Sequence, residues 1–119
     1  MAAGELSSTD RQLIDTTIRR AEQLSRCEFS VFVGNAGDNP RAFATRLHNS
    51  LVAPSRSVVV MVDPRARAVE VVWGSWTRPR LTDAEVDAAI AQMSADFAGG
   101  DLVGGIVRGI ERLAQDAKD

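Results

Sequence analysis

Apolar positions recur along the chain with two periods, and these periods predict helices and strands. Helical spacing of three and four residues marks four segments, at about 9–24, 40–51, 83–98 and 102–117. Alternating or unbroken apolar runs mark three strands, at about 28–34, 57–63 and 68–74. The order αβαββαα predicts an α/β fold in which four helices sandwich a mixed sheet of three to four strands.

The apolar run from Val58 to Val62 has no alternation, which is typical of a strand covered on both faces. We therefore place it at the centre of the sheet. A helix separates it from the preceding strand, which predicts a parallel pair joined by a right-handed crossover. The short turn after it predicts an antiparallel third strand. There Val69, Val71 and Trp73 share one face and Glu70 takes the other, which favours an edge position.

Capping signals predict where the helices begin. Thr9 with Gln12, and Thr82 with Glu85, have the spacing of a capping box. Asn39 precedes a proline that suits the first position of the second helix. The third helix, about 16 residues long, would carry the chain roughly 24 Å. It should therefore deliver the following turn to the end of the sheet where the first two strands finish.

The glycine-rich stretch FAGGDLVGGIVRGIERLA could be a phosphate cradle or the start of a helix. It lacks the Lys and Ser/Thr that a phosphate-binding loop needs. Asp101 stands where a helix cap is expected, and its carboxylate would repel an anion. Gly105 and Gly109 lie four residues apart on one side of the helix. We interpret the segment as a helix start that packs closely against a neighbour.

Composition limits the class of protein. The chain has 119 residues, enough for a flexible N-terminus at 1–7 and one domain at 8–119. A net charge of −2, with both signs interspersed, argues against nucleic-acid binding. No apolar run approaches the roughly 20 residues that span a bilayer, so we expect a cytoplasmic protein without membrane contact. Cys27 is the only cysteine, which excludes an intrachain disulfide and a cysteine-rich zinc site.

Three carboxylates are candidate ligands of a divalent cation. Asp38 and Asp63 follow the first two strands, and the length of the third helix should bring Asp101 to the same end of the sheet. Carboxylate oxygens from several loops suit calcium or magnesium, which could support phosphate-ester hydrolysis by an activated water. The alternative is that Asp38 is solvated, Asp63 begins a turn and Asp101 caps a helix.

The segment WGSWTRPRLTD carries the candidate docking residues. Alternation places Trp73 in the core, whereas Trp76 lies in a loop beside Arg78 and Arg80. A loop tryptophan near arginines suits a partner-binding hot spot. It would equally suit a lid on the core, with arginine stacked on the indole.

The order of VVVMVDPRARAVEVVWG, LTDAEVDAAI and the glycine-rich stretch resembles the TPM domain family, also called the TLP18.3/Psb32/MOLO-1 family. It is most similar to small actinobacterial, DUF5130-like members of undefined function. The chain departs from the family in reading VWG for Gly-aromatic-Gly and in a longer interval before the third helix. The positions that carry the resemblance are Arg67, Gly74, Leu81, Asp83, Phe97, Asp101, Gly105 and, more loosely, Gly109.

The resemblance implies an α/β sandwich and an unsettled set of functions. These include acid-phosphatase activity, calcium binding, photosystem repair and receptor modulation. We expect a non-enzymatic interaction or regulatory module that docks an unknown protein partner through the Trp76 loop or a sheet face. The alternative is a calcium- or magnesium-binding domain with weak acid-phosphatase-like activity.

Overall fold

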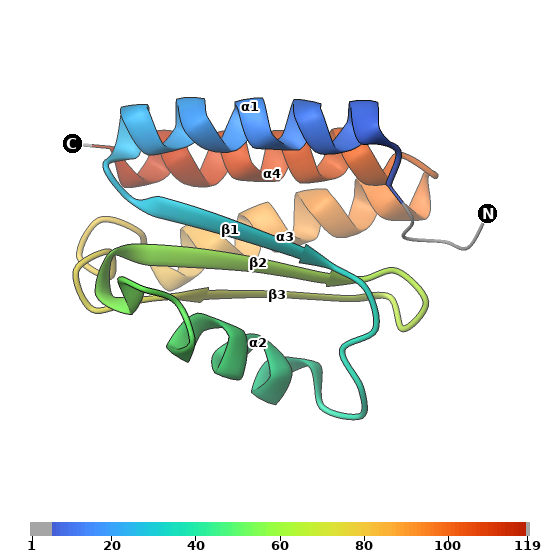
Figure 1. Ribbon diagram of the computed structural model, residues 1–119, viewed down its shortest axis with the longest axis horizontal. Helices are drawn as coiled ribbons and strands as arrows, with labels where there is room; N and C mark the ends of the chain where they lie inside the picture. Colours follow the sequence, from blue (N-terminus) through green and yellow to red (C-terminus); the bar gives the residue numbers. More distant parts are fainter. Residues whose placement is uncertain (1–5, 119) are drawn as a thin grey trace.

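The computed structural model describes residues 6–118 and has the expected order of elements (Figure 1). Residues 1–5 of the segment expected to be flexible lie outside the described residues. A short 3₁₀ turn, η1, precedes the central strand. The elements are α1 (Ser8–Ser25), β1 (Glu28–Val33), α2 (Pro40–Asn49), η1 (Pro54–Arg56), β2 (Ser57–Asp63), β3 (Ala68–Trp73), α3 (Asp83–Ala98) and α4 (Leu102–Ala117).

Over the described residues the sheet has three strands in the order β1-β2-β3, so the all-apolar strand is central as predicted. β1 and β2 are parallel, with Phe29 opposite Val58. β2 and β3 are antiparallel, with Val58 opposite Trp73. The start of β2 therefore lies beside the end of β3, and this register brings η1 next to the loop that follows β3.

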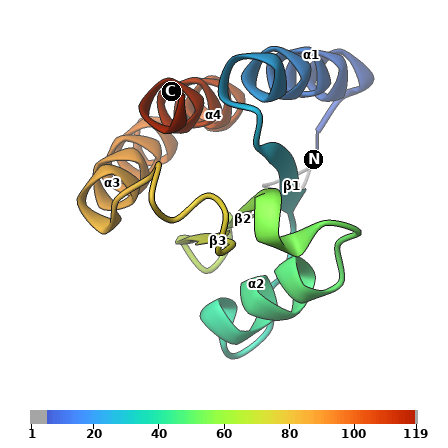
Figure 2. The ribbon, with the colours of Figure 1, turned by 90° about the vertical axis from the view of Figure 1, so that its left-hand side faces the viewer.

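The two faces of the sheet are covered unequally (Figure 2). Helices α1, α3 and α4 cover one face, where Val58, Val60 and Val62 join the larger hydrophobic core. The single helix α2 covers the other face, where Val59 and Met61 join the smaller core. Every residue of β2 is buried, which explains why its sequence shows no alternation.

The start of α1 differs from the prediction. Ser7, rather than Thr9, caps the helix: its side chain accepts a hydrogen bond from the Asp10 N–H, and Asp10 completes the capping box. Both residues are two positions upstream of the predicted pair, because two overlapping four-residue windows have the spacing of a capping box. The predicted caps Thr82 and Asn39 are confirmed at α3 and α2.

The glycines of α4 allow α3 to approach closely, as predicted. A Cβ atom at Gly109 would lie 2.4 Å from the Met93 Sδ atom, and one at Gly105 would lie 2.7 Å from the Phe97 ring. Met93 is fully buried, so its side chain has little room to move. The helix-start interpretation also holds, because the Asp101 side chain accepts a hydrogen bond from the Gly104 N–H.

Within residues 6–118, no helix combines the length and the apolar character needed to cross a membrane. Cys27 is buried, with 1% of its surface exposed, as expected for a small hydrophobic side chain.

Candidate functional site

Asp63 lies at the end of β2 and is only 3% exposed. Its two oxygens accept hydrogen bonds from separate backbone segments: Oδ2 from the Ala36 N–H at 2.9 Å and Oδ1 from the Ala66 N–H at 3.1 Å. The bond from Ala36 is the largest cause that holds the pKa of Asp63 below its ordinary value of 3.8, against the opposing effect of burial. Asp63 therefore ties the β1–α2 loop to the β2–β3 turn.

The other polar residues of the β1–α2 loop have separate tasks. Asn39 accepts a hydrogen bond from the Ala42 N–H as the α2 cap, and Asn35 accepts one from the Gly37 N–H within the loop. Asp38 is exposed. These loop contacts are local, as turn chemistry predicts for Asn and Asp.

Asp101 caps the start of α4. Figure 1 shows that α3 crosses the sheet and turns into α4 near the ends of β1 and β2, which is the expected end of the molecule. There Asp101 pairs with arginine: Arg108 Nη2 lies 2.8 Å from Asp101 Oδ2, and Arg108 Nε lies 3.1 Å from Asp96 Oδ2. Hydrogen bonding to Arg108 is the largest cause that lowers the pKa of both carboxyls. All three charged groups are held by one another across the α3–α4 turn.

The structure does not assemble the predicted cation ligands. Within residues 6–118, no group of three or more His, Cys, Asp or Glu side chains could hold a metal ion. Asp63 uses both oxygens on backbone N–H groups, Asp101 pairs with Arg108 and Asp38 is exposed. These are the structural roles that the sequence left open as the alternative.

Four of the resemblance positions have identifiable structural roles. Gly74 follows β3, where its missing Cβ lets the backbone of η1 approach. Arg67 closes the β2–β3 turn with a φ of 55°. Asp83 is the first residue of α3, where a negative charge favours the helix terminus. Gly105 lies against Phe97, so these two resemblance positions, eight residues apart in the sequence, pack against each other.

Two tryptophans and several arginines form a compact surface at the opposite end of the sheet. The Arg56 guanidinium lies 4.0 Å from the centre of the Trp76 ring, and that of Arg80 lies 4.1 Å from it. The Arg78 guanidinium lies 4.5 Å from the centre of the Trp73 ring. We call these five residues the Arg–Trp surface.

The two tryptophans differ in exposure within this surface. Trp73 is buried, as predicted, and its Nε1 donates a hydrogen bond to the Leu81 carbonyl at 3.0 Å. Trp76 is half-buried and packs against the larger core, while its backbone N–H donates to the Ser55 carbonyl at 3.0 Å. Trp76 therefore serves as a lid and as a platform for arginine stacking. The side chains that the surface presents outward are arginines.

Sequence reasoning missed Arg56 as a member of the Arg–Trp surface. Arg56 lies 20 positions before Trp76, in η1, so no local motif joins them. The signal that could have found it is the predicted antiparallel hairpin. That hairpin places the residue before β2 beside the residues after β3, as the register of Val58 with Trp73 shows.

The fold and its surfaces define a small α/β domain with a three-stranded mixed sheet, three helices on one face and one on the other. A family profile described as "Domain of unknown function (DUF5130)" matches residues 3–114. The chain belongs to this DUF5130 family.

Among curated proteins, the chain is similar to uncharacterized proteins of two Mycobacterium tuberculosis strains, CDC 1551 / Oshkosh and H37Rv. Each is 27% identical over 105 residues, which cover 88% of this chain and 63% of the relative. The chain thus spans less than two thirds of the length of these relatives.

Three solved structures have a similar fold. The BA42 protein of Bizionia argentinensis has a TM-score of 0.85 at 17% identity, covering 98% of this chain and 84% of that one. The N-terminal domain of cg2496 from Corynebacterium glutamicum has a TM-score of 0.76 at 20% identity, covering 98% of this chain and 76% of that one. The N-terminal domain of a P. gingivalis protein has a TM-score of 0.79 at 20% identity, covering 96% of this chain and 77% of that one. At such identities the likeness concerns the fold alone.

Proposed function

We propose that this chain is a non-enzymatic interaction module whose Arg–Trp surface holds an acidic segment of a partner protein. The observation that carries the proposal is the stacking of Arg56 and Arg80 on Trp76, with Arg78 stacked on the neighbouring tryptophan. Stacking covers the flat face of a guanidinium and leaves its N–H groups in the plane. Arg56 Nη2 donates to the Arg26 carbonyl at 3.4 Å. The other N–H groups of Arg56, and those of the exposed Arg78, can donate to a carboxylate. The stacked arginines are thereby held in position before a ligand arrives.

The chemistry of the surface selects the class of partner. Arg56 and Arg78 are exposed, and they come from η1 and from the loop after β3. Closely spaced guanidinium groups favour closely spaced carboxylates. The overall charge of −2 disfavours a long polyanion such as nucleic acid, which needs an extended basic face. Membership of the wider TPM family is part of this proposal and rests on the order and spacing of the resemblance positions.

A titration with a hexaglutamate peptide tests the proposal. Because Trp73 and Trp76 are the only tryptophans, their fluorescence reports on this surface directly. We expect a saturable change that weakens with added salt. Arg78→Gln should weaken binding about fivefold, the upper range for one exposed ion pair. Arg56→Lys should also weaken it, because lysine keeps the charge but loses the planar fork.

The matched control is Arg20→Gln, which removes the same charge from an exposed position on α1. This variant should bind the peptide as the unchanged protein does. If Arg20→Gln weakens binding as much as Arg78→Gln, the attraction reflects overall charge and the proposed surface is wrong. An absence of saturable change would also exclude it.

A further inference from the structure

The outer edge of β1 carries backbone groups that have no strand partner within residues 6–118. Gly34 donates its N–H to the Val62 carbonyl at 3.0 Å, so the backbone N–H and C=O groups of the even-numbered residues of this strand point toward β2. Because the backbone groups of a strand alternate in direction, Val31 and Val33 direct theirs away from the sheet. The Phe29 N–H confirms that odd-numbered residues direct their backbone groups away from β2, since it faces α1 and donates to Glu22 Oε2 at 3.0 Å.

The sequence of this edge lacks the residues that usually keep an edge strand from pairing with another strand. Edge strands are commonly blunted by lysine, proline or a β-bulge. The β1 sequence EFSVFV contains neither residue, and its register with β2 runs without interruption from Glu28 to Val33. Val31, Phe32 and Val33 are all only partly buried. The edge is therefore apolar and able to accept a further strand.

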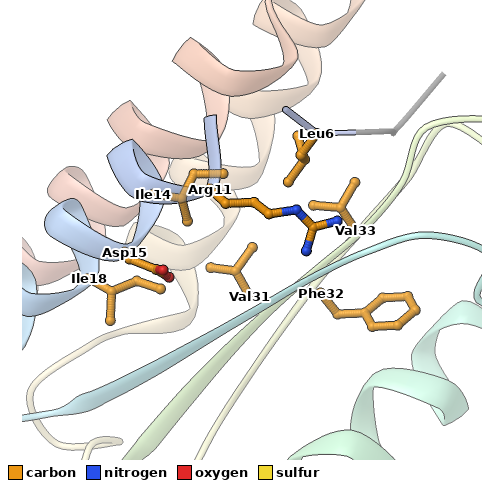
Figure 3. Close-up of a pocket in the computed structure, with 8 residues that line it drawn as sticks. All are labelled: Leu6, Arg11, Ile14, Asp15, Ile18, Val31, Phe32 and Val33. Carbon is orange, nitrogen blue, oxygen red and sulfur yellow. The ribbon is translucent and has the colours of Figure 1, made fainter. Parts of the chain in front are cut away.

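A groove of about 340 Å³ lies along the same edge, between α1 and β1 (Figure 3). We call it the β1 groove. The Arg11 side chain extends across it toward Val33, and Asp15 points into it, whereas Phe32 points to the other face of the sheet. Neither Arg11 nor Asp15 forms an ion pair with another described residue. The groove is lined by Leu6 before α1, by Arg11, Ile14, Asp15 and Ile18 on the helix, and by Val31, Phe32 and Val33 on the strand.

We infer that the β1 groove binds an extended segment of a partner protein, which adds to the sheet as a fourth strand. The outward N–H and C=O groups of Val31 and Val33 would pair with the backbone of the segment, as in other cases of strand addition. Alternate side chains of the segment would enter the groove, where Ile14 and Ile18 favour apolar groups. This surface is separate from the Arg–Trp surface.

The two charges of the groove restrict the sequence of the segment. Arg11 lies at the Val33 end and selects an acidic side chain there. Asp15 follows one helical turn later, about 6 Å along the axis. Consecutive groove-facing residues of a strand are about 6.6 Å apart, so Asp15 disfavours a second acidic residue at the next such position. The expected ligand is apolar at alternate positions, with one acidic residue at the end near Arg11.

A peptide suits this edge better than a second copy of the chain does. Helix α1 lies over the edge on the same side as the groove (Figure 2). Antiparallel pairing of two β1 strands would place both α1 helices on one face, so two helices would have to fit above the paired strands. An extended segment brings no helix with it.

Two synthetic peptides test the inference, with amide NMR spectra as the readout. Both are acetylated heptapeptides in which valine alternates with threonine after the first residue. The first residue is glutamate in one peptide and lysine in the other. In antiparallel pairing, the more stable arrangement, this residue lies near Arg11. The glutamate peptide should shift the amide signals of Val31 and Val33 and slow their hydrogen exchange. It should bind about threefold more tightly than the lysine peptide, the range for one exposed ion pair.

Two variants separate the contributions of backbone and charge. Arg11→Glu alters an exposed side chain and should reverse the preference, so that the lysine peptide binds more tightly. Val33→Pro removes an outward N–H without removing a hydrogen bond to β2, and it should weaken both peptides about tenfold. Arg78→Gln, on the other surface, should leave both affinities unchanged.

Three results would overturn the inference. One is protection of the Val31 and Val33 amides from exchange in the free chain. Another is a stable dimer in sedimentation experiments that Val33→Pro converts to monomer. In that case the β1 edge would pair with a second copy of the chain. The third is peptide binding with the same preference in Arg11→Glu. Since Val33→Pro could unfold the chain, Arg11→Glu provides an independent result.

Discussion

Replacing Gly74 with alanine is expected to lower the free energy of unfolding by about 3 kcal/mol, measured by urea denaturation. A Cβ atom at this position would lie 2.1 Å from the Pro54 carbonyl oxygen and 2.5 Å from that of Ser55. Both are backbone atoms, so no side-chain rotation can relieve the contact. Separation of η1 from the loop after β3 would also pull Arg56 from Trp76. Gly74→Ala should therefore reduce hexaglutamate binding as well as stability.

Gly99→Ala is the matched control for this prediction. Gly99 ends α3 with a φ of −82°, which alanine adopts without strain. Its added methyl would meet the nearest atom, the Asp96 carbonyl oxygen, at 3.5 Å. We expect a change within about 0.5 kcal/mol. Equal effects of the two substitutions would show that close approach of the backbone is not the reason for glycine at position 74.

The fold could be predicted because its local signals and its tertiary contacts agree. The unbroken apolar run of β2 marks the sheet centre, and that strand is buried along its whole length. Thr82 and Glu85 mark the start of α3 because a capping box acts within a few residues. The one misplaced helix start, at Ser7 instead of Thr9, lies where two overlapping windows satisfy the same rule. Pattern alone does not choose between them.

The chemical sites were less predictable, because one residue type serves several purposes. A carboxylate that caps a helix or closes a turn has the same sequence signature as one that binds a cation, as Asp101 and Asp63 illustrate. Arg56 joins the Arg–Trp surface only through the register of the β2–β3 hairpin. The open edge of β1 follows from strand order, which places β1 beside β2 alone within residues 6–118. These features depend on contacts between distant segments.

Asp63→Asn is expected to destabilise the chain by about 2 kcal/mol at pH 7, the range for hydrogen bonds to a charged group. The carboxylate accepts from the N–H groups of both Ala36 and Ala66, whereas an amide offers one acceptor and one donor. One of the two N–H groups would then face an NH₂ group. The exposed Asp38 provides the control, and Asp38→Asn should change stability by less than about 0.5 kcal/mol.

The effect of Asp63→Asn should depend on pH with a definite sign. The hydrogen bond from Ala36 holds the pKa of Asp63 below 3.8 in the folded state. A carboxyl whose folded-state pKa is lowered stabilises the fold above its unfolded pKa, and this contribution is lost as the pH falls through the folded pKa. The stability difference between the unchanged chain and Asp63→Asn should therefore be full at pH 7 and shrink below about pH 4. Urea denaturation from pH 7 to pH 3 measures it. A difference that stays constant over this interval would show that Asp63 does not act through its charge, and that the lost stability comes from altered packing around the β1–α2 loop.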